Sequence, residues 1–207
     1  MTEEYYTVAG KAEGELVEKR SKFIATVLPV HSQEEAMAYI DALRSKYWDA
    51  RHNVYAYTLL DGQIKRYSDD GEPSGTAGVP VLNVIEKLEL KDTLVVVTRY
   101  FGGILLGTGG LVRAYSGSAQ GVVASADIKT MTNCDEIEIK CDYGMFDTLN
   151  NMLKEIPGGI ISSDFTDSVL TKIYIDAKET DGFCAKLIDV FGGKIEINKI
   201  NSKFYPI

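Results

Sequence analysis

The stretch from Leu94 to Tyr115 constrains the fold of this chain more than any other part of its sequence. It begins with Leu94–Thr98, a short apolar run rich in β-branched residues, which predicts a buried strand. Five glycines follow in two clusters and lead into a helix. Glycine lets backbone approach a ligand closely, and the first turn of a helix has free N–H groups. This order of elements therefore predicts a site that holds an anion.

The anion-site interpretation assigns a role to most residues of this stretch. They are Arg99, Tyr100, Phe101, Gly102, Gly103, Gly107, Thr108, Gly109, Gly110, Arg113 and Tyr115. No Lys-Ser or Lys-Thr pair follows Gly107, and the glycine spacing does not fit G-x-G-x-x-G, so neither standard nucleotide motif applies. Two alternatives stay open: the glycines serve only strand-to-helix packing, and the aromatic pair Tyr100-Phe101 packs in a core instead of stacking on a ring.

A second dense cluster occupies residues 66–80. It follows a predicted strand over residues 51–60, an Asp61-Gly62 hairpin turn and a second strand over Gln63–Tyr67. We expect the following residues of this region to join the site: Arg51, His52, Arg66, Asp69, Asp70, Glu72, Ser74 and Thr76. His52 is either an acid–base group or a structural histidine. Ser74 and Thr76 are either hydroxyl donors to an anion or helix N-caps.

The carboxylates of the second cluster admit several roles. Asp69, Asp70 and Glu72 could bind Mg²⁺ or act as a base, but a turn rich in aspartate and glycine also forms without any function. The acids and the arginines could equally satisfy one another as a structural network. We expect no metal site and no cofactor.

The distribution of charge separates two parts of the chain. The net charge of −8 argues against binding of bulk nucleic acid through a basic surface. All six arginines precede residue 114, and residues 131–207 carry lysine as their only strong cation. Because arginine is the residue of bidentate anion recognition, we expect the site in a first domain, residues 1–130. Residues 131–207 form a second domain.

The remaining elements follow from local patterns. In the first domain we expect a strand over Phe23–Leu28, ended by Pro29, then a helix capped by Ser32 and a helix over residues 110–126. The pattern breaks at residues 127–134. Strand, helix, two strands, helix and strand then follow, which is the order of a ferredoxin-like domain. They are expected at residues 135–141, 143–156, 159–169, 170–177, 179–191 and 194–200.

Three scattered cysteines, Cys134, Cys141 and Cys184, form no C-x-x-C pair and fit free thiols in a reducing compartment. The acidic start of the chain lacks the pattern of a signal peptide, and no apolar run approaches the roughly 18 residues of a membrane span. We therefore expect a cytoplasmic protein.

Four motif blocks resemble the IMPACT family, in its bacterial, YigZ-type, two-domain form. The blocks are residues 21–25 (SKFIA), 51–53 (RHN), 66–80 (RYSDDGEPSGTAGVP) and 96–115 (VVTRYFGGILLGTGGLVRAY). The resemblance implies an α+β protein with a ribosomal protein S5 domain 2-like N-terminal domain. It also implies that the ferredoxin-like C-terminal domain resembles a C-terminal domain of elongation factor G.

The resemblance also bears on function. Eukaryotic IMPACT proteins regulate translation, and bacterial members are suspected of binding RNA or ribosome-associated factors. Our leading hypothesis is a translation-associated regulatory protein that contacts RNA or another phosphate-bearing ligand through the glycine loops and arginines. Two alternatives remain: an enzyme acting on a nucleotide or phosphorylated small molecule, and a protein-interaction module that regulates translation. The glycine loop lacks the lysine of a nucleotide-binding loop, and the sequence shows no clear catalytic nucleophile. Both features favour a protein that is not an enzyme.

Overall fold

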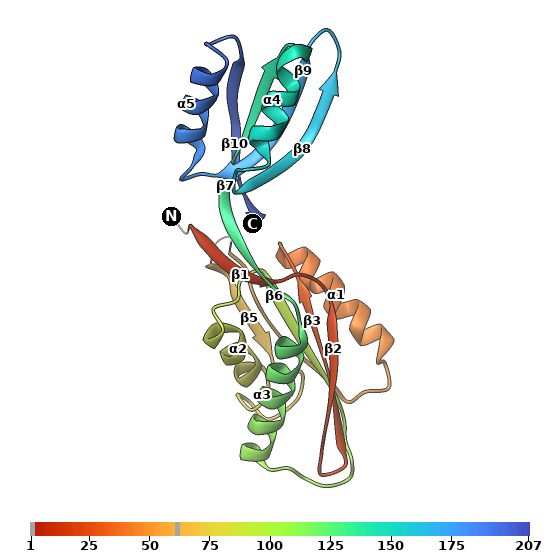
Figure 1. Cartoon of the computed structure of the whole chain (residues 1–207). Helices are drawn as coiled ribbons and strands as arrows, with labels where there is room; N and C mark the ends of the chain where they lie inside the picture. Colours follow the sequence, from red (N-terminus) through yellow and green to blue (C-terminus); the bar gives the residue numbers. More distant parts are fainter. Residues whose placement is uncertain (1–2, 61–62) are drawn as a thin grey trace. The chain divides into compact units, whose positions relative to one another are not determined.

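The computed structural model describes residues 3–60 and 63–207 and shows a mixed α+β protein of two compact units (Figure 1). One unit comprises Tyr5–Lys129, and the other comprises Thr130–Ile207 with Glu3 and Glu4. The predicted Asp61-Gly62 hairpin turn lies outside the described residues. No helix in the described ranges is long and apolar enough to cross a membrane.

The first unit is built on an antiparallel sheet with the strand order β2-β3-β6-β4-β5. Its strands are β2 (Ala12–Glu18), β3 (Ser21–Pro29), β4 (His52–Thr58), β5 (Lys65–Ser68) and β6 (Thr93–Tyr100). The central strand β6 is buried from Thr93 to Arg99, as the apolar run predicted. A further strand, β1 (Glu4–Val8), precedes them, and its Tyr6 bridges to Leu90.

The sequence did not predict β2, because this edge strand has no fully buried residue, and only Ala12, Gly14 and Leu16 alternate as partly buried positions. It pairs with β3 over its whole length. Backbone pairing with β3, together with Ala12 and Leu16 packed against the core, therefore places this strand.

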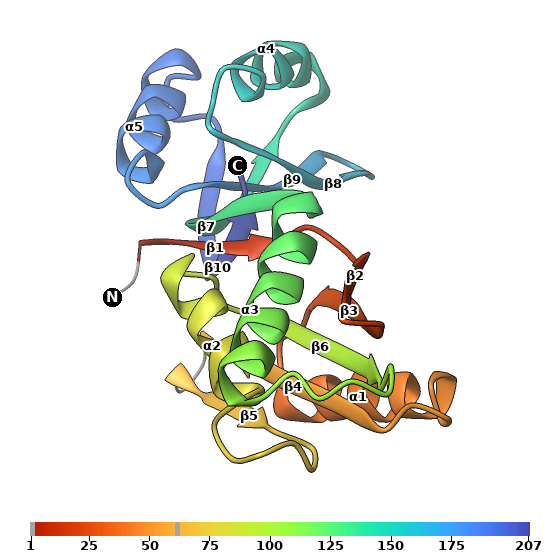
Figure 2. The same ribbon diagram turned by 90° about the horizontal axis from the view of Figure 1, so that it is seen from below.

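Three helices cover the two faces of this sheet. α1 (Gln33–Lys46) packs Ala36, Ile40 and Leu43 on one face. α2 (Gly78–Lys87) and α3 (Thr108–Ser125) cover the opposite face (Figure 2). The predicted cap of α1 is confirmed, because the hydroxyl of Ser32 accepts the N–H of Glu35 at 3.1 Å.

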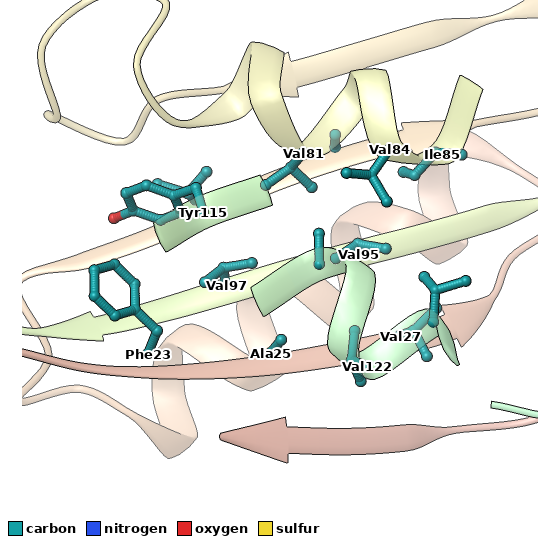
Figure 3. Packing of buried hydrophobic residues seen from close by; sticks show 14 of the residues in the cluster. Phe23, Ala25, Val27, Val81, Val84, Ile85, Val95, Val97, Tyr115 and Val122 are labelled. Atoms are coloured by element: carbon teal, nitrogen blue, oxygen red, sulfur yellow. The ribbon is translucent and has the colours of Figure 1, made fainter. Parts of the chain in front are cut away.

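The main core lies between β6 and the helix pair. Val81 and Ile85 of α2 pack with Val95 and Val97 of β6, and Figure 3 shows these side chains meeting between the layers. Tyr115 of α3 meets Phe23 of β3 edge to face, with ring centroids 5.2 Å apart. This aromatic pair adds its interaction to the area that it buries, and it fixes the position of α3 over the sheet.

The second unit runs β7 (Ile128–Cys141), α4 (Tyr143–Leu153), β8 (Gly158–Phe165), β9 (Val169–Asp176), α5 (Thr180–Val190) and β10 (Glu196–Pro206). The pairs of these four strands are antiparallel: β9 lies between β8 and β7, and β10 pairs with the other edge of β7. Both helices pack on one core with Ile137 and Ile173. Cys134 and Cys141 are buried, Cys184 is half-buried, and all three are free.

Two expectations about the second unit were wrong at their boundaries. Residues 128–134 continue as part of β7, although the sequence there shows no alternation that marks a strand. The last strand does not end near Ile200 but continues to Pro206, because Lys199 and Ser202 both bind the buried carboxylate of Asp135. A register shift between Lys199 and Asn201 accompanies this contact.

Candidate functional site

A pocket of about 430 Å³ lies in the first unit, where the end of β6 meets the start of α3. Predicted site residues line it, among them Arg51, His52, Glu72, Arg99 and Phe101. Gly107 and Thr108 contribute the start of α3. The volume lies within the range of pockets that hold small ligands, roughly 300–1,000 Å³. Residues from both predicted clusters therefore meet at one site.

The floor of the pocket holds a buried ion pair. The Arg99 Nη1 atom donates to Glu72 Oε1 at 2.6 Å, and the side chains are only 7% and 4% exposed. The Tyr115 hydroxyl donates to the same oxygen at 2.7 Å. Burial and the Glu72 charge raise the pKa of Tyr115 well above its usual range, so the phenol remains a donor. The sequence left open whether acids and arginines satisfy one another as a structural network, and Arg99 and Glu72 do so.

Two aromatic rings lie close to the Arg99 guanidinium. Its carbon lies 5.5 Å from the ring centroid of Phe23 and 5.6 Å from that of Phe101. These distances allow cation–π attraction. The Nε atom is buried without a hydrogen-bond partner among the described residues. Arg99 is thus fixed in place while part of its donor capacity stays unused.

His52 stands beside Glu72 on the wall of the pocket. Its Nδ1 atom lies 2.7 Å from the carbonyl oxygen of Asp70, which can only accept, so Nδ1 carries the proton. Its Nε2 atom lies 3.9 Å from Glu72 Oε1, too far for a hydrogen bond. Asp70 is itself held by the backbone N–H of Asn53 at 2.6 Å and by Arg44 at 3.0 Å. This network orients the imidazole with Nε2 on the pocket side.

The N-terminus of α3 forms the second wall. Within the described part of the chain, no side chain caps this helix, whose N-cap is Gly107. The first intrahelical bond runs from Leu111 N–H to Gly107 C=O, so the three preceding N–H groups have no partner inside the helix. These groups and the helix dipole favour a negative charge at this end. The exposed guanidinium of Arg51 lines the same pocket.

Glycine is required at three positions of the loop that leads to α3. Gly103 and Gly107 have φ angles of +84° and +71°, which side chains with a Cβ rarely adopt. At Gly102 a Cβ would lie 2.0 Å from the carbonyl carbon of Arg20, so the loop lies directly on the turn between β2 and β3. At least these three glycines therefore shape the loop itself, and Gly107 also lines the pocket.

The second glycine loop does not offer an open helix N-terminus. The Asp69 carboxylate accepts the N–H groups of Gly75, Ala77 and Gly78 at 2.8, 3.1 and 2.8 Å, which closes the start of α2. Neither Ser74 nor Thr76 caps this helix; the Thr76 hydroxyl donates to Pro73 C=O at 2.6 Å. The Asp69 carboxylate thus occupies the place at the start of α2 where a bound anion was expected.

Several predicted residues lie away from the pocket. Arg66 is exposed on β5 and donates to Lys65 C=O at 3.0 Å. Arg113 lines a separate, smaller pocket with Lys19, on the other side of Leu106. The Tyr100 hydroxyl donates to Asp49 at 2.8 Å. The structure therefore brings together Arg51 and Arg99 but not all four expected arginines.

Sequence reasoning missed the apolar part of the pocket wall. Pro73, Leu105, Leu106 and Leu111 line it, and Leu105 is 83% exposed. All four lie inside the two motif blocks, but leucine in a loop carries no chemical signal of a site. Another pocket of about 470 Å³ lies at Tyr6, Leu88 and Ile128. Lys87 is the charged member of its lining, so this pocket has fewer groups that could recognise a charged ligand. Among the described residues, no group of three His, Cys, Asp or Glu side chains could hold a metal ion.

Comparison with known proteins agrees with the motif blocks. Residues 19–123 match the model of the Impact N-terminal domain, and residues 139–194 match a domain of unknown function, DUF1949. The chain is 36% identical to the IMPACT family member YvyE of Bacillus subtilis, over 96% of this chain and 92% of that protein. It is 35% identical to the IMPACT family member YigZ of Escherichia coli, over 86% of this chain and 89% of that one.

More distant and structural comparisons point the same way. Protein IMPACT of Mus musculus is 36% identical over 44% of this chain and 30% of its own length. A solved structure titled as a hypothetical protein superimposes with a TM-score of 0.65 at 33% identity, covering 97% of this chain and 99% of that one. Both bacterial relatives share the chain over nearly its whole length, so the similarity extends beyond the first domain. The chain belongs to the IMPACT family.

Proposed function

We propose that this protein is a translation-associated binding protein that holds a phosphate-bearing ligand, such as RNA, in the pocket between β6 and α3. The observation that carries the proposal is the uncapped N-terminus of α3, which faces this pocket beside the exposed Arg51. Helix N-termini and arginines are the groups that proteins use for phosphate. The translational setting rests on the resemblance to eukaryotic IMPACT proteins.

Within this proposal, Arg51, Thr108 and the first-turn N–H groups of α3 hold the phosphate. Phe101, 42% exposed on the pocket wall, offers the ring on which a base stacks. The Asp69 and Glu72 carboxylates already accept bonds from protein donors, so we propose that no resident metal ion takes part. The protein acts in the cytoplasm, with an N-terminal S5 domain 2-like domain and a ferredoxin-like C-terminal domain. The strand order of the second unit supports the latter assignment.

A titration with single-stranded RNA tests the proposal. The measurement is the dissociation constant of a fluorescently labelled oligonucleotide for the nuclease-treated full chain. We expect Arg51→Ala to weaken binding about tenfold, since charge-assisted hydrogen bonds contribute about 1.5–3 kcal/mol. Arg66→Ala is the matched control, because Arg66 is also exposed in the same domain but lies outside the pocket. Equal losses in both variants, or a loss in neither, would contradict this site.

One observation favours a protein partner as a second candidate. Phe101, Ile104 and Leu105 are 42%, 41% and 83% exposed on a single loop, which is more apolar surface than a loop needs. A protein-interaction module would bind through this loop. In a pull-down from lysate, Ile104→Ser, a change on the loop outside the pocket lining, would then release a specific protein while RNA binding stays unchanged. Loss of RNA alone would favour the first candidate.

A further inference from the structure

We propose that the hairpin tip between β2 and β3 forms a second phosphate subsite with Arg113, so that a strand of RNA binds across two adjoining pockets. The inference rests on the proposed function and deepens it. Arg51 and the start of α3 hold one phosphate, and Lys19 and Arg113 hold a later phosphate of the same strand. The ligand is therefore a single strand with at least two phosphates.

A small pocket of about 160 Å³ forms this subsite. Lys19 and Arg113 line it, and Leu106 is a wall that it shares with the larger pocket at the start of α3. Glu18 is the acid of its lining. Its volume is below the roughly 300–1,000 Å³ of pockets that enclose a whole small ligand. The pocket therefore suits one group of a longer ligand that also occupies the larger pocket.

The backbone of the hairpin tip adopts a conformation that its residue types do not favour. β2 and β3 pair up to Glu18 and Ser21, which leaves Lys19 and Arg20 as a two-residue turn. Both turn residues have positive φ angles, +44° and +66°. Turns of this kind prefer asparagine and glycine, because residues with longer side chains reach positive φ only at a cost. Two cations in place of the preferred pair indicate that their side chains have a use beyond the turn.

The cations of the subsite have no counter-charge among the described residues. Lys19, Arg20 and Arg113 are exposed and form no ion pair there, whereas Lys22 of the same hairpin pairs with Glu15 at 2.6 Å. Positive charges that are not neutralised within the protein attract an anion from solution. Phosphate fits this position because it accepts several hydrogen bonds from arginine and lysine at once.

Arg113 and the hairpin tip both contact the loop and helix that form the larger pocket. The Arg113 Nη1 atom would lie 3.9 Å from a Cβ at Gly109, so the guanidinium lies over the first turn of α3. That turn contains no acidic residue, and a cation near the positive end of a helix is unfavourable until an anion binds. The Gly102 N–H donates to Ser21 Oγ at 3.2 Å, and a Cβ at Gly102 would touch the Arg20 backbone. The loop thus holds both subsites in a fixed relation.

A paired substitution at the turn separates a phosphate contact from a role in folding. Lys19→Asn/Arg20→Gly removes both cations and supplies the pair that the turn prefers. We expect the melting temperature to stay the same or rise by about 2–4 °C. The dissociation constant of a labelled oligouridylate of about ten nucleotides should rise about tenfold. Arg113→Gln, exposed on α3, should weaken binding to a similar extent.

The salt dependence of binding gives a second readout. Each phosphate contact at the subsite steepens the slope of the logarithm of affinity against that of salt concentration by about 0.7. The turn variant should lose this part of the slope and retain the part that the larger pocket contributes. An unchanged slope would mean that the two cations do not contact phosphate.

Lys11→Asn/Lys46→Asn is the matched control. It also removes two positive charges, but Glu13 already pairs with both lysines, at 2.7 and 3.1 Å, so RNA binding should change less than twofold. Unchanged binding in the turn variant, while Arg51→Ala still weakens it, would overturn the second subsite and leave the proposed function standing. Weaker binding together with a lower melting temperature would also overturn the subsite, because the cations would then serve the fold. Full RNA binding in Arg51→Ala would overturn the proposed function itself.

Discussion

At the scale of single residues, the two arginines of the pocket have opposite roles. Arg99 is buried and paired with Glu72 at 2.6 Å, whereas Arg51 is exposed at the mouth. The sequence alone could not distinguish these two roles, because both arginines lie in motif blocks that were expected to bind an anion. Arg99 stands at the end of the buried strand β6, opposite Phe23 and His52 in the sheet register, and this pairing buries it.

This difference predicts a difference in stability. Arg99→Ala leaves the Glu72 carboxylate buried without its counter-ion, which costs about 3–5 kcal/mol of unfolding free energy. Arg51→Ala, a surface change, should stay within about 0.5 kcal/mol. Urea unfolding followed by circular dichroism measures both. A small loss for Arg99→Ala would mean that Glu72 is not held by this ion pair.

At the scale of elements, the loop between β6 and α3 depends on its contact with the β2–β3 turn. Gly102→Ala would place a methyl group 2.0 Å from the Arg20 backbone, so the loop must move and carry Phe101 with it. We expect a loss of about 2 kcal/mol or more in stability, beyond the usual range for a surface change, together with weaker RNA binding. Gly10→Ala, where nothing lies within 4 Å, is the control and should change neither. Unchanged RNA binding in Gly102→Ala would show that the loop does not shape the site.

The elements also show how much the sequence could predict. The buried strand β6, the Ser32 cap and the helix that opens after Gly107 all follow from local patterns, and the structure contains them. The closed start of α2 could not be predicted, because Asp69 reaches Gly78 across nine residues of irregular loop. Similarly, β2 has only partly buried side chains, and its pairing with β3 is not marked by a local pattern. Long-range contacts, not local propensities, decided what the sequence missed.

At the scale of the whole molecule, the charge balance limits how nucleic acid can bind. The chain carries a net charge of −8, and the described pocket offers Arg51 and one helix N-terminus at its mouth. One or two phosphate contacts on a single strand give a slope of about −0.7 to −1.4 for the logarithm of affinity against that of salt concentration. RNA titrations at several salt concentrations measure this slope. A slope steeper than about −3 would instead indicate a broad basic surface.

The paired state of Arg99 has a further consequence for the kinetics of recognition. Its guanidinium is oriented by Glu72, Phe23 and Phe101 before any ligand arrives. The entropy of ordering this side chain is lost during folding and not during association. We therefore expect that the floor of the pocket does not rearrange on binding. RNA association followed after rapid mixing should show a single kinetic phase, with no slow phase after the first encounter.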